Sequence, residues 1–139
     1  LEMGYCLYGM DIHENVNPLE AGLGWIVKRK KGDFIGLDAV NALKEKGLTH
    51  RLVAFHTVDR GIPRHNHRLF DENDNEIGVV TSGTFSPSLR NGIGLAYVPV
   101  EYKAPGTQLK LHIRNKPITC EVQKLPFVKD TSLARWLDK

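Results

Sequence analysis

The sequence predicts a mainly β protein with short helices, an α+β chain in which a six-stranded antiparallel barrel follows a mixed segment. From residue 48 onward, about six short apolar or alternating stretches are separated by turn residues, with no long helix between them. Short strands without crossover helices pair antiparallel, and six of them most economically close into a small barrel. We therefore expect a boundary near residue 48, a barrel over 48–128 and a tail over 129–139.

Residues 1–47 carry two helix signals. Asn17 is a possible N-cap, and Pro18 suits the first turn of a short helix that ends near a pair of glycines. The buried stripe of this helix would consist of Leu19, Leu23 and Ile26. Residues 33–47 have a second helical apolar face, lysines in the last turn, and Gly47 as the stop.

The strands are read from alternation and turn residues. In the first strand, Val53 and Phe55 fall on one face, and Leu52, Ala54 and His56 fall on the other. The dense polar cluster 71–75 predicts the turn of a hairpin. The expected strands are 51–58, 68–70, 76–83, 92–100, 108–114 and 119–128.

Composition excludes several functional classes. The chain has 139 residues, 41% hydrophobic and 25% charged, which is typical of a globular protein with room for one domain, or one domain plus part of another. No apolar run approaches a membrane span, and no signal peptide is recognisable. Two lone cysteines favour a reducing compartment. The basic run 28–31 has no aromatic residues interleaved with it, so we expect a solvated loop and no nucleic-acid partner.

The histidines and acidic residues do not predict a metal site. His65 and His67 form a His-x-His pair, but no cysteine pair supplies the further ligands that zinc needs. The stretch that begins at Asp71 lacks the glycine and the glutamate that a calcium loop requires at its sixth and twelfth positions. We therefore expect no bound metal.

The stretch "VVTSGTFSPSLRNGIGLAY", residues 79–97, looks at first like an active-site loop. Ser82 and Ser86 lack the Gly-x-Ser-x-Gly context of a nucleophile. Gly92 and Gly94 have no helix after them to bind a phosphate, so we expect them to permit close strand approach. The stretch is therefore interpreted as a connection between two barrel strands.

The residues alone do not decide the roles of two charged features. Three arginines at 60, 64 and 68 could grip a carboxylate or an acidic partner. The alternative that we prefer is that they bond barrel-end carbonyls and pair with Asp59, Asp71 or Glu72. Glu2 stands in an apolar stretch, and its carboxylate must face solvent or have a dedicated partner.

Seven segments resemble, in order and spacing, the C-terminal part of aminomethyltransferases, the T-proteins of glycine cleavage systems. The resemblance runs from Leu1 to about Val128. The segments are "LEMGYCLYGMDI", "NPLEAGLGW", "DFIG", "RGIPR", "IGVVTSGTFSPSL", "IGLAYVP" and "PFV". It implies that residues 1–47 are the end of a folate-binding domain and that residues 48–128 are the C-terminal barrel.

The resemblance also implies a function in glycine catabolism and one-carbon metabolism. T-proteins transfer the methylene group of an aminomethyl-lipoyl H-protein to tetrahydrofolate and release ammonia. Glu2 matches the family's pterin-binding glutamate, Arg29 matches a folate-contacting arginine, and Arg135 stands near a tail contact. The family's catalytic aspartate belongs to an N-terminal half that this chain lacks, so we expect no catalytic residue here and no activity from the isolated chain.

Two further expectations follow from the resemblance. The alternative within the same family is a folate-binding regulatory or tRNA-modifying relative that transfers no aminomethyl group. The expected location is the cytoplasm of a bacterium, or the mitochondrial matrix in a eukaryote, with no membrane as partner.

Overall fold

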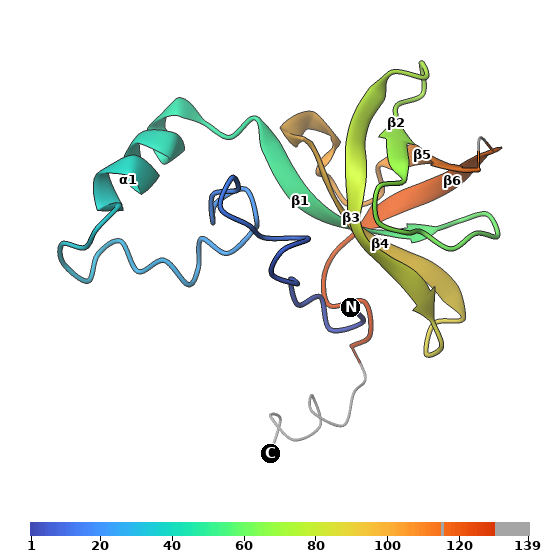
Figure 1. The fold of residues 1–139 in the computed structure, drawn as a ribbon, viewed down its shortest axis with the longest axis horizontal. Coiled ribbons are helices and arrows are strands. Elements are labelled where there is room, and N and C mark those ends of the chain that lie inside the picture. The colour runs from blue at the N-terminus through green and yellow to red at the C-terminus, as the bar shows by residue number, and fades with distance from the viewer. Residues whose placement is uncertain (115, 130–139) are drawn as a thin grey trace.

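Six antiparallel strands close into a barrel in the order β1–β4–β3–β2–β5–β6 (Figure 1). The computed structural model describes residues 1–114 and 116–129. The strands are β1 (His50–Thr57), β2 (Arg68–Phe70), β3 (Glu76–Ser86), β4 (Asn91–Pro99), β5 (Gln108–Ile113) and β6 (Lys116–Gln123). The helices are α1 (Leu37–Lys46) and the short 3₁₀ helix η1 (Val100–Tyr102). The predicted fold class, a mainly β chain with an antiparallel six-stranded barrel, is confirmed.

The alternation predicted two faces for β1, and the structure shows that each face belongs to a different buried cluster. Val53 and Phe55 belong to the large buried cluster that draws residues from all six strands. Ala54 and Leu52 pack on the outer face, in a second cluster that includes Phe127. Burying both faces in this way removes more apolar surface from water than a single interior core would.

The last strand differs from its prediction. We expected a strand over 119–128, but β6 begins at Lys116 and ends at Gln123. Pro126 lacks the N–H that a ladder would need, and the amides of Phe127 and Val128 donate to the carbonyl of Glu2 at 3.0 and 3.2 Å instead. The chain therefore leaves the barrel and lays Phe127 against its outer face.

The predicted short helix after Asn17 is wrong, although its cap forms. The Oδ1 atom of Asn17 accepts a hydrogen bond from the backbone N–H of Glu20 at 2.9 Å, as an N-cap does. Gly22 then adopts a left-handed conformation, with φ of 79°, and the segment closes into successive turns. The expected stripe is broken as a result, and Trp25 and Ile26 are exposed. The second predicted helix is present as α1.

Glycines on β3 and β4 allow close packing at one end of the barrel. A Cβ on Gly94 would lie 2.5 Å from the ring of Phe55, and one on Gly83 would lie 2.6 Å from the carbonyl of Pro63. A Cβ on Gly92 would collide with the carbonyl of Gly61. These contacts confirm that the glycines of the 79–97 stretch serve close approach of the chain.

Candidate functional site

Glu2 is bound by two serines at the end of β3. The hydroxyl of Ser86 donates to Oε1 of Glu2. The backbone N–H of Ser88 donates to the same oxygen at 3.3 Å, and the hydroxyl of Ser88 donates to Oε2 at 3.0 Å. The carboxylate predicted to bind folate therefore contacts the stretch that the sequence singled out as a loop.

The backbone of Glu2 is held by hydrogen bonds, as its side chain is. Its carbonyl accepts the two amides of Phe127 and Val128, which ties the N-terminal segment to the chain leaving β6. Ser86 is fully buried, and its hydroxyl also accepts the amide of Leu89 at 3.1 Å, so its orientation is set from both sides.

These hydrogen bonds favour the charged form of Glu2. The hydrogen bond from Ser86 lowers the pKa of Glu2 below its ordinary value, burial opposes this shift, and the bonds from Ser88 add to the lowering. Sequence reasoning left Glu2 without a partner in the chain and considered Ser86 only as a nucleophile. The signal that could have found the contact is the Ser-x-Ser spacing in a turn, since both hydroxyls can then reach one carboxylate.

Asp11 is a second carboxylate at the same junction, and sequence reasoning missed it. It is fully buried, and it accepts hydrogen bonds from the amide of Leu7 at 2.8 Å and from the hydroxyls of Thr81 and Ser82 at 2.5 and 2.9 Å. The hydroxyl of Tyr97 donates to its carbonyl at 2.8 Å. Asp11 therefore fixes the segment that carries Glu2 against β3 and β4.

Arg29, the other predicted folate contact, lies beside α1. It is half-buried and donates to Oδ1 of Asn41 in α1 at 3.4 Å. It lines a hollow of about 480 Å³ with Trp25 and Arg51. These two residues also line a neighbouring hollow of about 600 Å³, which reaches Met3 beside Glu2. The structure thus places Arg29 and the neighbours of Glu2 on adjoining hollows, while Arg135 lies outside the described residues.

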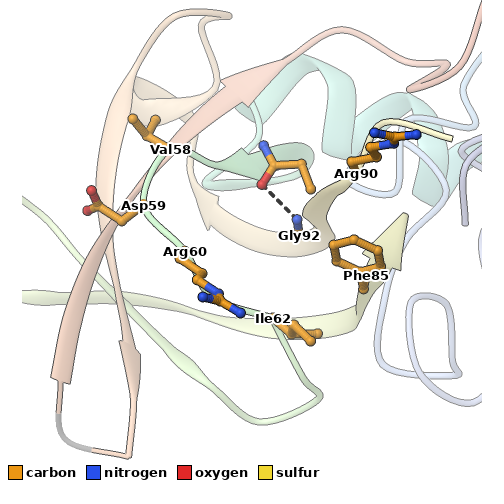
Figure 2. Close-up of a pocket in the computed structure, with 9 residues that line it drawn as sticks. Val58, Asp59, Arg60, Ile62, Phe85, Arg90 and Gly92 are labelled. Carbon is orange, nitrogen blue, oxygen red and sulfur yellow. Dashed lines mark hydrogen bonds between the residues drawn. The ribbon is translucent and has the colours of Figure 1, made fainter. Parts of the chain in front are cut away.

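A further hollow of about 560 Å³ lies at one end of the barrel (Figure 2). In Figure 2, the side chain of Arg60 extends toward Ile62 and Phe85, whereas the side chain of Arg90 extends away from the hollow. The Asp59 carboxylate beside them accepts the amide of Thr119 at 2.7 Å, and this bond lowers the pKa of Asp59.

The three predicted arginines do not form one cluster. Arg64 donates to the carbonyl of Gly83 at 3.4 Å, which confirms the expected bond to a barrel-end carbonyl. Arg68 pairs with Glu76 of the neighbouring strand, not with Asp59, Asp71 or Glu72. That part of the prediction is wrong because β2 and β3 are adjacent and antiparallel, which brings Arg68 and Glu76 together across the hairpin.

The two histidines of the His-x-His pair contact the backbone. Nδ1 of His65 lies 2.8 Å from the carbonyl of Thr81, and Nδ1 of His67 accepts the amide of Arg64 at 3.2 Å. Across residues 1–114 and 116–129, no group of three or more potential metal ligands comes together. Within the same ranges, no helix has the length and apolar character that a membrane crossing requires.

The comparisons with known proteins agree with this architecture. An aminomethyltransferase of Halothermothrix orenii is 54% identical over 128 residues, which cover 92% of this chain and 36% of the relative. One of Flavobacterium psychrophilum is 46% identical over 129 residues, 93% of this chain and 36% of the relative. The crystal structure of the glycine cleavage system aminomethyltransferase T from Bartonella henselae superposes with a TM-score of 0.87, at 39% identity, over 92% of this chain and 36% of that one.

The chain therefore spans about 36% of the length of these relatives. Residues 50–129 match the sequence model of one family domain, the glycine cleavage T-protein C-terminal barrel domain. This match begins at the first residue of β1 and covers all six strands of the barrel. The chain belongs to the glycine cleavage T-protein family and contains its C-terminal barrel domain.

Proposed function

We propose that this chain is the C-terminal third of a tetrahydrofolate-dependent aminomethyltransferase. The similarity supports this proposal beyond the barrel, because an alignment of 128 residues has to include most of residues 1–49. The relatives named above are aminomethyltransferases. Their names favour group transfer over the alternative of a regulatory or tRNA-modifying relative.

In the proposed reaction, tetrahydrofolate attacks the methylene carbon of the aminomethyl group on the lipoyl arm of an H-protein. Ammonia leaves, the carbon–sulfur bond breaks, and methylenetetrahydrofolate and dihydrolipoyl H-protein form. The protein accelerates such a step by holding both reactants in position, which converts an encounter into an intramolecular reaction. The proposed contributions of this chain are therefore binding and orientation of folate.

The observation that carries the proposal is the fixed, charged carboxylate of Glu2. A carboxylate can accept two N–H groups from the 2-aminopyrimidinone edge of a pterin. The hydrogen bonds from Ser86 and Ser88 hold the group in one orientation and favour its ionised form. We assign Glu2 to the pterin, and Arg29 and Arg135 to further folate contacts.

The test replaces Glu2 in the full-length enzyme. Glu2→Gln keeps the shape of the side chain but replaces an acceptor oxygen by a donor, so tetrahydrofolate binding should weaken by ~1–3 kcal/mol. Calorimetric titration measures the dissociation constant, and Glu14→Gln, an exposed position of the same segment, is the matched control. An unchanged dissociation constant for Glu2→Gln would remove Glu2 from the site. In a separate assay of glycine cleavage activity, the isolated chain should form no methylenetetrahydrofolate.

A further inference from the structure

The carboxylate of Glu2 is nearly saturated with donors from its own chain. Oε1 accepts two of them, the Ser86 hydroxyl and the Ser88 amide, and Oε2 accepts the Ser88 hydroxyl. Two carboxylate oxygens offer about four acceptor positions in total. A ligand that presents two N–H groups side by side therefore cannot be accommodated unless one of these three bonds is released.

The two serines differ in how easily they can be released. Ser86 is fully buried at the end of β3, and its hydroxyl is held by Leu89 as well as by Glu2. Ser88 is exposed in the turn between β3 and β4, and its amide lies at the long distance of 3.3 Å. An exposed turn residue exchanges a hydrogen bond with solvent or ligand at lower cost than a buried one.

We propose that Ser86 and Ser88 are positioning residues for Glu2 with opposite effects on folate. Ser86 aims the carboxylate and stays bound to it, whereas Ser88 occupies the ligand-facing acceptors until the pterin N–H groups replace it. This inference rests on the proposed function, because it assigns the pterin edge to Glu2. It gives the Ser-Pro-Ser turn of the 79–97 stretch a role in the site, although neither serine takes part in bond making.

The electrostatics of the site agree with these roles. Ser86 is the largest cause of the lowered pKa of Glu2, and Ser88 is a smaller one. A smaller contribution to the lowered pKa of Glu2 comes from the charged amino group of Leu1. A peptide bond replaces that group in the full-length enzyme. The pH dependence of folate binding there should respond chiefly to Ser86.

The experiment compares Ser86→Ala, Ser88→Ala and Ser88→Thr in the full-length enzyme, by calorimetric titration with tetrahydrofolate under anaerobic conditions. Ser86→Ala should raise the dissociation constant roughly five- to thirty-fold. It should also move the acid limb of binding to higher pH, because the Glu2 carboxylate loses its strongest stabilising donor. Ser88→Ala should lower the dissociation constant, by about five-fold or less, and Ser88→Thr should restore the original value because it keeps the hydroxyl.

Thr84→Val is the matched control, since the Thr84 hydroxyl contacts only the carbonyl of Phe85, at 3.5 Å, among the hydrogen bonds of the described residues. Two results would overturn the inference: unchanged affinity and unchanged acid limb in Ser86→Ala, or weaker binding in Ser88→Ala. If Glu2→Gln weakens binding while either of these is observed, the inference fails and the proposed function stands. If Glu2→Gln leaves tetrahydrofolate binding unchanged, the assignment of Glu2 to the pterin in the proposed function is itself wrong.

Discussion

The barrel and the segment before it bury their residues to very different extents. The interior of the barrel is a continuous cluster in which Phe55, Leu69, Val80 and Leu111 are completely buried. In residues 1–47, all of which the structure describes, only Asp11 and Ala21 are buried. The same segment exposes large apolar side chains, namely Tyr5, Leu7, Tyr8, Trp25, Ile26 and Ile35.

This difference shows that the two regions are stabilised in different ways. The barrel has the buried apolar surface that makes a unit stable on its own. The segment instead depends on polar contacts with the barrel, through Asp11 and through the Arg51 side chain, which donates to the carbonyl of Leu19. Exposed aromatic residues around two adjoining hollows are typical of a surface that binds a ligand or another part of a protein.

The largest expected effect comes from emptying the barrel core. Phe55→Ala should lower the free energy of unfolding by about 3–5 kcal/mol, because it removes a completely buried ring and leaves a cavity. Trp25→Ala is the matched control in the segment, where the side chain is 72% exposed, and it should cost less than about 0.5 kcal/mol. Urea denaturation of the chain measures both. Equal losses of unfolding free energy in the two variants would contradict the difference between the barrel and the segment.

The barrel could be predicted from the sequence because its signals are local. Alternation in β1 separated Val53 and Phe55 from the residues of the other face, and the polar cluster 71–75 marked the turn between β2 and β3. The predictions of secondary structure were wrong where local sequence patterns compete with contacts between residues far apart in the chain. The apolar end of the predicted last strand packs Phe127 on the outside of the barrel, and the left-handed Gly22 interrupts the predicted helix.

The hydrogen-bond partners within the candidate site could not be predicted from the sequence, for a physical reason. Glu2 could be singled out because a carboxylate in an apolar stretch needs a partner. Its partners, Ser86 and Ser88, lie more than eighty residues away and become neighbours only when β3 folds against the N-terminal segment. Asp11 escaped notice because two of its three donors, the hydroxyls of Thr81 and Ser82, likewise approach it only in the fold.

A smaller and more local effect is expected at Asp11. Asp11→Ala leaves the Leu7 amide and the Ser82 hydroxyl without their acceptor and removes one of the two acceptors of the Thr81 hydroxyl, which should cost the segment about 1–3 kcal/mol of local stability. The amide of Leu7 should then exchange with deuterium roughly ten- to a hundred-fold faster. The core strands of the barrel should keep their protection, and Asp33→Ala, an exposed position of the same segment, should change neither. Loss of protection throughout the barrel would show that segment and barrel form one cooperative unit.

The smallest expected effect is a pH dependence of stability that arises from a carboxylate of the barrel and does not involve residues 1–47. Asp71, in the turn before β3, accepts hydrogen bonds from the side chain and the amide of Asn75 at 2.9 Å, and these lower its pKa below the ordinary value of 3.8. A lowered pKa in the folded state means that the unfolded chain binds more protons. The stabilisation is therefore present above the ordinary pKa and is lost as pH falls toward the folded value.

Asp71→Asn removes this contribution at every pH. The difference in unfolding free energy between the original chain and the variant should be largest near neutral pH, and it should shrink as the pH falls from about 5 to about 3. Urea denaturation at several pH values measures the difference. Exchange of the Leu7 amide should be the same in both proteins, because Asp71 contacts the barrel turn and Tyr102 of η1. A pH-independent difference would mean that Asp71 acts through the shape of the turn and that its charge does not stabilise the barrel.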